Sequence, residues 1–292
     1  MQNNIRIIPR LDIKGPNLVK GVHLEGLRVL GRPVDFAKYY YENNADELIY
    51  IDTVASLYNR NSLHRFIEET AEKVFIPLTV GGGLRTIEDI RAVLRCGADK
   101  VALNTEAIKN PQIIKEASKV FGASTIVITI EAIKESDGRY LAFTNNGREF
   151  TGVEVLGWAR KVEELGAGEI LLTSVDRDGT GFGFDIELTR MISNAVSIPV
   201  IASGGAGKKE HIRKVIEDGN ADAVAMASIL HYDAIKILLD GSDRRCTDEG
   251  NIEFLKSKKE FSKVQPAGLN EIKEYLAGSG IKSRFNKMEN AI

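Results

Sequence analysis

Two carboxyl groups in this sequence could act together as a general acid and a general base. Asp12 and Glu131 each stand at the end of a short apolar run. Proton transfer needs one protonated and one ionised member, and two carboxyls in different surroundings supply such a pair. The alternative for either carboxyl is a structural ion pair with a lysine such as Lys14 or Lys20.

Two glycine clusters could hold phosphate groups. Gly81-Gly82-Gly83 and Ser203-Gly204-Gly205-Ala206-Gly207 each follow an apolar run, and a hydroxyl residue follows the next run in both cases. Glycine lets the backbone approach a ligand closely, and backbone N–H groups before a helix bind anions. The alternative for each cluster is a tight turn. The duplication favours two phosphate sites and a long substrate with a phosphate at each end. The residues expected to bind it are Gly82, Gly83, Asn104, Thr105, Gly204, Gly205 and Ser228.

A third polar cluster is the run Ser174-Val-Asp-Arg-Asp-Gly-Thr, which also follows an apolar stretch. We expect Asp178, Gly179 and Thr180 to contact the ligand, with loop ordering as the alternative, since Asp-Gly often marks a turn. A calcium loop is discounted because the later ligands are missing. The four histidines have no metal-ligand spacing with one another or with a cysteine, so no metal and no cofactor is expected.

These residues must be positioned by alternating strands and helices. Eight apolar runs are typical of strands buried on both faces. They are Ile5–Leu11, Glu47–Asp52, Pro77–Val80, Lys100–Leu103, Ser124–Glu131, Glu169–Thr173, Pro199–Ala202 and Ala223–Met226. Helical patterns lie between them at Val34–Asn43, Leu63–Lys73, Ile87–Arg95, Pro111–Val120, Val153–Glu164, Ile186–Ala195 and His211–Asp218, with a last one at Leu269–Leu276. The alternation predicts an α/β fold, the (β/α)₈ or TIM barrel, with the active face at the carboxyl ends of the strands.

An internal repeat divides the predicted barrel into two halves. Ile76-Pro-Leu-Thr-Val-Gly-Gly-Gly recurs as Ile198-Pro-Val-Ile-Ala-Ser-Gly-Gly, an offset of 122 residues. Ala98-Asp-Lys-Val-Ala-Leu-Asn-Thr recurs as Ala221-Asp-Ala-Val-Ala-Met-Ala-Ser at an offset of 123. Matches at one period place the second to fourth strands in register with the sixth to eighth. The sequence therefore predicts one barrel domain over residues 1–292, built from two (βα)₄ half-barrels.

Composition limits the class of protein. The chain has 292 residues, 43% of them hydrophobic, and a net charge of −2, so it offers no global field for nucleic acid or membrane. Its two cysteines cannot build a disulfide framework, and we expect a reducing, cytoplasmic setting. The first residues do not have the pattern of a signal peptide, and no run approaches the roughly 18 apolar residues of a membrane span.

Several of these motifs together resemble one family. The chain is similar to the cyclase subunit of imidazole glycerol phosphate synthase, a histidine-pathway barrel that works with a glutaminase. The resemblance covers residues 5 to about 233 and again 269–284. Its most specific run is Leu172-Thr-Ser-Val-Asp-Arg-Asp-Gly-Thr, which the related isomerase barrel lacks.

The resemblance implies a lyase-type ring closure. In that family, ammonia attacks phosphoribulosyl-formimino-aminoimidazole carboxamide ribotide, here called the ribotide. The products are imidazole glycerol phosphate and aminoimidazole carboxamide ribotide. The substrate carries two phosphates, as the two glycine clusters suggest. Asp12 matches the family's first catalytic aspartate, and Lys20 falls on a substrate-contacting position. Residues at the other barrel end match the ring around the ammonia entrance, which implies a glutaminase partner at that amino-terminal face. They are Arg6, Glu47, Lys100 and Glu169, and plain stability pairs are the alternative.

Three features depart from the family pattern. Glu131 replaces its second catalytic aspartate, and Arg10 replaces a cysteine and is expected to reach a carboxylate such as Glu131 or an anionic substrate. An insertion of residues 237–265 separates the eighth strand from the last helix on the catalytic side. It could form a lid, a substrate-selecting arm or an oligomer contact, or it could be a solvated elaboration without a role in the chemistry.

The sequence Asn145-Asn-Gly predicts a hairpin in the loop after the fifth strand, which is either a mobile flap or a static hairpin.

Three functions follow from these features. The first is the ammonia-dependent cyclase. The second is a paralogue that keeps the glutaminase but forms an amidine on a nucleotide-linked sugar for surface glycans, which Glu131, Arg10 and the insertion favour. The third, a non-catalytic scaffold, leaves Asp12 and the entrance ring unexplained. The double phosphate site favours the cyclase.

Overall fold

A computed structural model describes residues 4–55, 63–238 and 263–285 and contains the predicted closed barrel. Eight parallel strands pair in the order β1–β4–β5–β6–β7–β10–β11–β12, and β12 pairs with β1 to close the ring. The strands are β1 (Arg6–Lys14), β4 (Leu48–Asp52), β5 (Leu78–Gly81), β6 (Lys100–Leu103), β7 (Ile126–Lys134), β10 (Glu169–Ser174), β11 (Val200–Ser203) and β12 (Ala223–Met226). The TIM barrel expected from the sequence is therefore confirmed.

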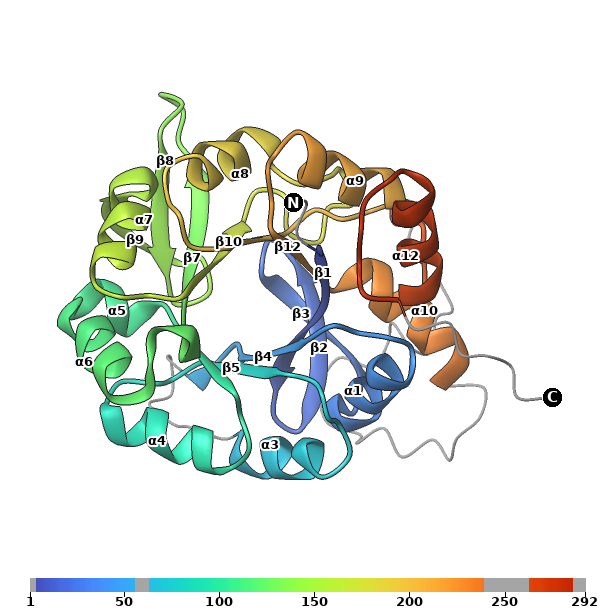
Figure 1. Cartoon of the computed structure of the whole chain (residues 1–292), viewed down its shortest axis with the longest axis horizontal. Helices are drawn as coiled ribbons and strands as arrows, with labels where there is room; N and C mark the ends of the chain where they lie inside the picture. The colour runs from blue at the N-terminus through green and yellow to red at the C-terminus, as the bar shows by residue number, and fades with distance from the viewer. Residues whose placement is uncertain (1–3, 56–62, 239–262, 286–292) are drawn as a thin grey trace.

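Helices surround the strands on the outside of the ring (Figure 1). They are α1 (Pro33–Glu42), α3 (His64–Ala71), α4 (Ile87–Arg95), α5 (Thr105–Lys109), α6 (Gln112–Phe121), α7 (Val155–Glu164), α8 (Ile186–Ser193), α9 (Lys209–Glu217), α10 (Ser228–Leu238) and α12 (Leu269–Gly278). The predicted helix from Val153 starts two residues too early. Helix α7 begins after Glu154, whose carboxylate accepts the N–H groups of Leu156 and Gly157.

The apolar residues form two cores, separated by the strand ring. Successive residues of a strand point to opposite faces, so Ile7 and Leu11 of β1 pack outward in the large core with the helices. Ile8 points inward and belongs to the small cluster inside the barrel, with Ile49, Ala102, Val127, Leu171, Ile201, Ala223 and Ala225. By the same alternation, Arg6, Arg10 and Asp12 face the barrel interior.

The two halves of the barrel match in register. Ile51 pairs with Gly81 between β4 and β5, and Thr173 pairs with Ser203 between β10 and β11. In each half, an aspartate in the loop before one strand also accepts a hydrogen bond from the start of the preceding strand. The Asp99 carboxylate accepts the Leu78 N–H at 2.8 Å. Asp222 accepts the N–H of Val200 at 2.9 Å in the same way.

Two antiparallel hairpins extend from the carboxyl ends of the strands. The predicted hairpin is present as β8 (Tyr140–Thr144) and β9 (Glu149–Glu154). A second hairpin, which the sequence did not suggest, consists of β2 (Asn17–Val22) and β3 (Glu25–Gly31). Its tip packs on the loop after β10, where the His23 N–H donates to the Asp178 carbonyl at 2.9 Å. The hairpin therefore covers part of the barrel mouth.

The proposed insertion lies mostly outside the described residues. Ile237 is the penultimate residue of α10, and residues 239–262 are not described. Beyond them, the Gln265 N–H donates to the Gly207 carbonyl at 2.7 Å in the loop after β11. The chain thus returns to the barrel at the carboxyl ends of the strands.

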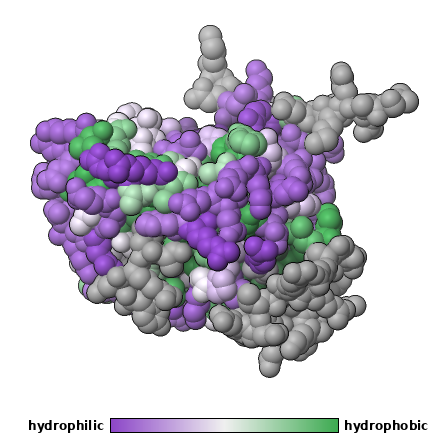
Figure 2. All heavy atoms as spheres, turned by 90° about the horizontal axis from the view of Figure 1, so that it is seen from below, coloured by the Kyte–Doolittle hydropathy of each residue, from purple (hydrophilic) through white to green (hydrophobic). Residues whose placement is uncertain are grey.

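From the side shown in Figure 2, the described surface is mainly hydrophilic, with hydrophobic residues in separate groups. Among the described residues, no helix is long and apolar enough to cross a membrane.

Candidate active site

The two candidate catalytic carboxyls lie at the barrel mouth, on different strands. Asp12 is 2% exposed on β1, and Glu131 is 6% exposed on β7. Asp12 interacts with two cations. Its Oδ1 accepts the Arg10 Nε–H at 2.9 Å, and its Oδ2 lies 3.8 Å from the Lys20 Nζ. Asp12 therefore lies between two positively charged side chains.

Glu131 has different surroundings, which favour its protonated form. Burial raises the pKa of Glu131 from 4.5 to about 7. The Gly147 N–H, which donates to Oε2 at 2.8 Å, and the Arg10 charge act against this rise, while Asp12 adds to it. Near neutral pH, Glu131 therefore carries a proton in a large part of the molecules. Two carboxyls with unequal surroundings suit a base and an acid.

The raised pKa of Glu131 predicts a pH-dependent effect of Glu131→Gln on stability. The folded protein binds more protons than the unfolded chain between about pH 4.5 and 7, so wild-type stability falls as pH rises through this window. Glutamine does not ionise, and the variant should gain on the order of 2 kcal/mol relative to wild type between pH 5 and 8. Urea unfolding at both pH values measures this. Glu274→Gln, at an exposed position, is the control, and a stability difference between Glu131→Gln and wild type that is equal at pH 5 and 8 would contradict the prediction.

Arg10 lies inside the barrel mouth and reaches a carboxylate as expected, but that carboxylate belongs to Asp12 and not to Glu131. Its guanidinium donates through Nε to Asp12, and through Nη1 to Thr173 Oγ1 at 3.0 Å and Ser203 Oγ at 3.3 Å. Arg10 and Asp12 face the same side because they are two residues apart on one strand. Arg10 thus crosses from β1 to β10 and β11.

The first glycine cluster lines a cavity of about 120 Å³, which we call the Gly82 pocket. All four residues predicted from this half of the barrel line it. They are Gly82, Gly83, Asn104 and Thr105, joined by Arg10 and Glu131. The buried Oδ1 of Asn104 has no hydrogen-bond partner among the described residues, so the pocket offers an unused acceptor.

The second glycine cluster lines a smaller cavity of about 20 Å³, the Gly204 pocket. It collects Lys20, Asp178, Gly179, Gly204, Gly205 and Ser228, together with Arg10. Lys20 comes from the β2–β3 hairpin, and its Nζ lies 2.6 Å from Asp178 Oδ2. The hairpin therefore delivers a buried cation to this pocket.

The backbone conformation and the close packing in both pockets can be adopted only by glycine. Gly82 and Gly205 have φ values of 106° and 105°, a region that disfavours other residues. A Cβ on Gly82 would lie 2.5 Å from the Asp52 carbonyl oxygen, and one on Gly205 would lie 2.2 Å from that of Gly183. Both halves therefore use the same close backbone approach.

Thr180 is the one predicted binding residue among these loops that lines neither pocket. Its hydroxyl donates to the Arg177 carbonyl at 2.7 Å and accepts the Phe182 N–H, which orders the loop.

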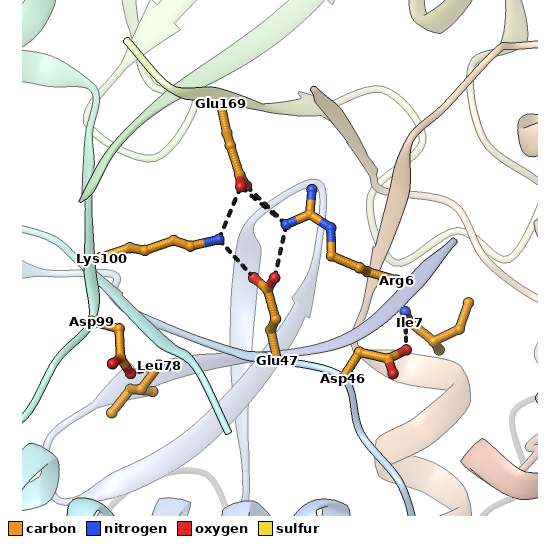
Figure 3. Close-up of polar contacts among 8 residues, drawn as sticks. All are labelled: Arg6, Ile7, Asp46, Glu47, Leu78, Asp99, Lys100 and Glu169. Atoms are coloured by element: carbon orange, nitrogen blue, oxygen red, sulfur yellow. Dashed lines mark hydrogen bonds and ion pairs between the residues drawn. The ribbon is translucent and has the colours of Figure 1, made fainter. Parts of the chain in front are cut away.

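Four charged residues form a closed ring at the amino-terminal end of the barrel (Figure 3). Arg6 Nη1 lies 2.8 Å from Glu47 and 3.1 Å from Glu169. Lys100 Nζ completes the ring, at 3.1 Å from Glu47 and 2.9 Å from Glu169. Each cation contacts both anions, so the four predicted gate residues lie together around the barrel axis.

Three further residues at the barrel mouth contact the predicted site residues. Thr173 and Ser203 contact Arg10, and Gly147 contacts Glu131. Strand alternation offered a signal for Thr173 and Ser203, which lie opposite each other near the ends of the neighbouring strands β10 and β11. Among the described residues, no group of three or more His, Cys, Asp or Glu could hold a metal ion.

Comparisons with known proteins agree with this architecture. Residues 6–236 match the model of the family described as histidine biosynthesis protein. The HisF subunit of imidazole glycerol phosphate synthase from Legionella pneumophila is 60% identical over 208 residues, which cover 71% of this chain and 98% of the relative. The HisF subunit from Methanocaldococcus jannaschii is 48% identical over 264 residues, covering 84% and 96%. The chain therefore belongs to the histidine biosynthesis family and, within it, to the HisF cyclase subunits of imidazole glycerol phosphate synthase.

Proposed function

We propose that this enzyme converts the ribotide and ammonia into imidazole glycerol phosphate and aminoimidazole carboxamide ribotide. The observation that supports this most directly is the pair of glycine pockets, one in each half-barrel, with Arg10 lining both. A substrate with a phosphate at each end would place its central, reacting segment at the Asp12–Glu131 pair.

The two carboxyls have distinct roles in this reaction. Ammonia loses protons as it joins the substrate, and the departing groups must gain them. Asp12, a carboxylate beside Arg10, is the proposed base. Glu131, with its pKa raised to about 7 by burial, is the proposed acid. Positioned acid–base groups contribute about 10²- to 10⁴-fold each to a rate.

The direct test supplies the ribotide and an ammonium salt to the purified chain. We expect both products in equal amounts, with a rate that rises with the concentration of free ammonia. Inorganic phosphate should compete with the ribotide, since it occupies the glycine pockets. A folded sample that releases neither product would overturn the proposal.

We further propose that a glutaminase subunit docks at the amino-terminal face and delivers ammonia through the barrel. The ring of Arg6, Glu47, Lys100 and Glu169 at that face supports this. The interior cluster behind the ring includes three small residues, Ala102, Ala223 and Ala225. The proposed compartment is the cytoplasm, in keeping with the low cysteine content.

A Lys100→Met variant should separate the two ammonia sources. Without Lys100, Glu47 and Glu169 each lose one cation, and the ring is expected to open or rearrange. We expect the glutamine-dependent rate, measured with the glutaminase present, to fall about tenfold relative to the ammonium-dependent rate. Steady-state assays with each nitrogen source give this ratio. Exposed Lys115→Met is the control, and an unchanged ratio in Lys100→Met would contradict the gate.

A second candidate function is supported by Arg10 and Glu131. A paralogue could use the same ammonia to form an amidine on a nucleotide-linked sugar, with Arg10 contacting a differently shaped anion. Turnover of the ribotide by the wild-type chain would exclude this as the main activity. Ammonia-dependent amidine formation on a nucleotide sugar, without ribotide turnover, would favour it.

A further inference from the structure

A buried arginine occupies the centre of the mouth and is not used by the proposed acid–base chemistry. Arg10 is 3% exposed, and the described residues place no other side chain in both glycine pockets. A cation removed from water is stable only when its N–H groups are paired. The partners of this guanidinium therefore show what the mouth is built to bind.

The protein satisfies only part of the guanidinium. Nε donates to Asp12, and Nη1 donates to Thr173 and Ser203. Among the described residues, no hydrogen bond engages Nη2. An arginine carries five N–H donors in a planar fork, so the Nη2 edge keeps donors for a ligand.

The position of Arg10 specifies which part of the ligand it meets. The Gly82 pocket is lined by residues of β4, β6 and β7 and of the loop after β5. The Gly204 pocket is lined by residues of β11 and β12 and of the loops after β10 and β11. A molecule with a phosphate in each pocket must pass Arg10 with its central segment. An oxygen acceptor in that segment would accept the remaining N–H groups of the guanidinium, whereas an apolar or cationic group would leave those N–H groups buried without a partner.

We propose that Arg10 is a specificity-determining residue, which selects substrates with a carbonyl, hydroxyl or carboxylate oxygen midway between their two phosphates. This inference rests on the proposed function, because it assumes that both pockets hold phosphates of one molecule. Arg10 binds that oxygen through Nη2 and keeps Asp12 oriented through Nε. Arg10 thus recognises the central segment of the substrate, while the glycine loops bind its two phosphates.

The test separates recognition of the central segment from phosphate binding. Calorimetry without ammonium measures ribotide and inorganic phosphate binding to wild type, Arg10→Met, Arg10→Lys and exposed Arg213→Met. Losing a charge-assisted hydrogen bond predicts about 10- to 100-fold weaker ribotide binding in Arg10→Met. Arg10→Lys keeps the charge but not the fork and should fall between. Phosphate affinity should fall far less than ribotide affinity, because the glycine loops also bind the phosphates, and Arg213→Met should match wild type.

Three results would overturn the proposed role of Arg10. Unchanged ribotide affinity in Arg10→Met would show that the guanidinium does not contact the substrate. Equal losses for ribotide and phosphate would show that Arg10 acts on the phosphates or the fold and not on the central segment. A large fall in melting temperature in both Arg10 variants would show that it only supports the fold. A wild-type chain that neither binds nor converts the ribotide would instead overturn the proposed function, and this substrate assignment with it.

Discussion

Asp12→Asn is expected to lower the ammonium-dependent rate by about 10²- to 10⁴-fold, the usual contribution of a positioned base. Asparagine keeps the shape of the side chain but cannot accept a proton at neutral pH. The ribotide should still bind, because Asp12 lines neither glycine pocket. The loss should therefore appear in kcat, with a smaller change in KM.

The Asp12→Asn experiment needs a folding control, because the substitution also leaves Arg10 and Lys20 with less negative charge nearby. Removing one partner of a buried ion pair is strongly destabilising. Circular dichroism melting and inorganic phosphate binding show whether the variant is folded with both pockets intact. Exposed Asp137→Asn serves as the matched control. A folded Asp12→Asn that keeps its kcat within about threefold would remove Asp12 from the chemistry.

The second large effect on the rate is expected at Glu131, where the length of the side chain is as important as its carboxyl group. Its Oε2 accepts the Gly147 N–H from the β8–β9 turn at 2.8 Å. Glu131→Asp withdraws the carboxyl by about 1.5 Å, and a misplacement of about 1 Å costs roughly 10²-fold in rate. We therefore expect a loss on that order in Glu131→Asp, even though aspartate stands here in the family pattern.

The pH profile distinguishes the role of Glu131 from its position. As an acid with a pKa raised to about 7 by burial, it must be protonated to act. The wild-type rate should then fall as pH rises through about 7, and Glu131→Gln should lose this limb along with most of its activity. Rates measured from pH 5.5 to 9 at a fixed concentration of free ammonia test this. A Glu131→Gln profile with the same descending limb would assign that limb to another group.

Much of the architecture could be predicted because local patterns and the repeat agree. The β8–β9 hairpin was predicted from Asn145, Asn146 and Gly147, which adopt φ values of 54°, 64° and 75° in the turn. Asparagine and glycine tolerate that region, so the turn is visible in the sequence. The same holds for the glycine clusters, whose duplication pointed to both pockets.

The β2–β3 hairpin could not be predicted in this way. Its turn contains His23 and Leu24 at φ 53° and 60°, residues that give no turn signal. Contacts with the loop after β10 hold it, including the His23 N–H to the Asp178 carbonyl. Such contacts depend on the tertiary fold.

The contacts of Arg10 could be predicted only in part. Strand alternation alone places Arg10 and Asp12 on one face, two residues apart, so their pairing was available from the sequence. Its reach to Thr173 and Ser203 depends on how the barrel closes, since those residues lie more than 160 positions away. The sequence therefore suggested a cation near the mouth but not its place between the two pockets.

The central claim is that this chain inserts ammonia nitrogen into the ribotide and cleaves it. The most direct measurement supplies ¹⁵N-ammonium and the ribotide to the purified chain and follows both products by NMR. The proposed function predicts ¹⁵N in the ring of imidazole glycerol phosphate and none in the released aminoimidazole carboxamide ribotide. Unlabelled products, or an unconsumed ribotide with a folded enzyme, would contradict it.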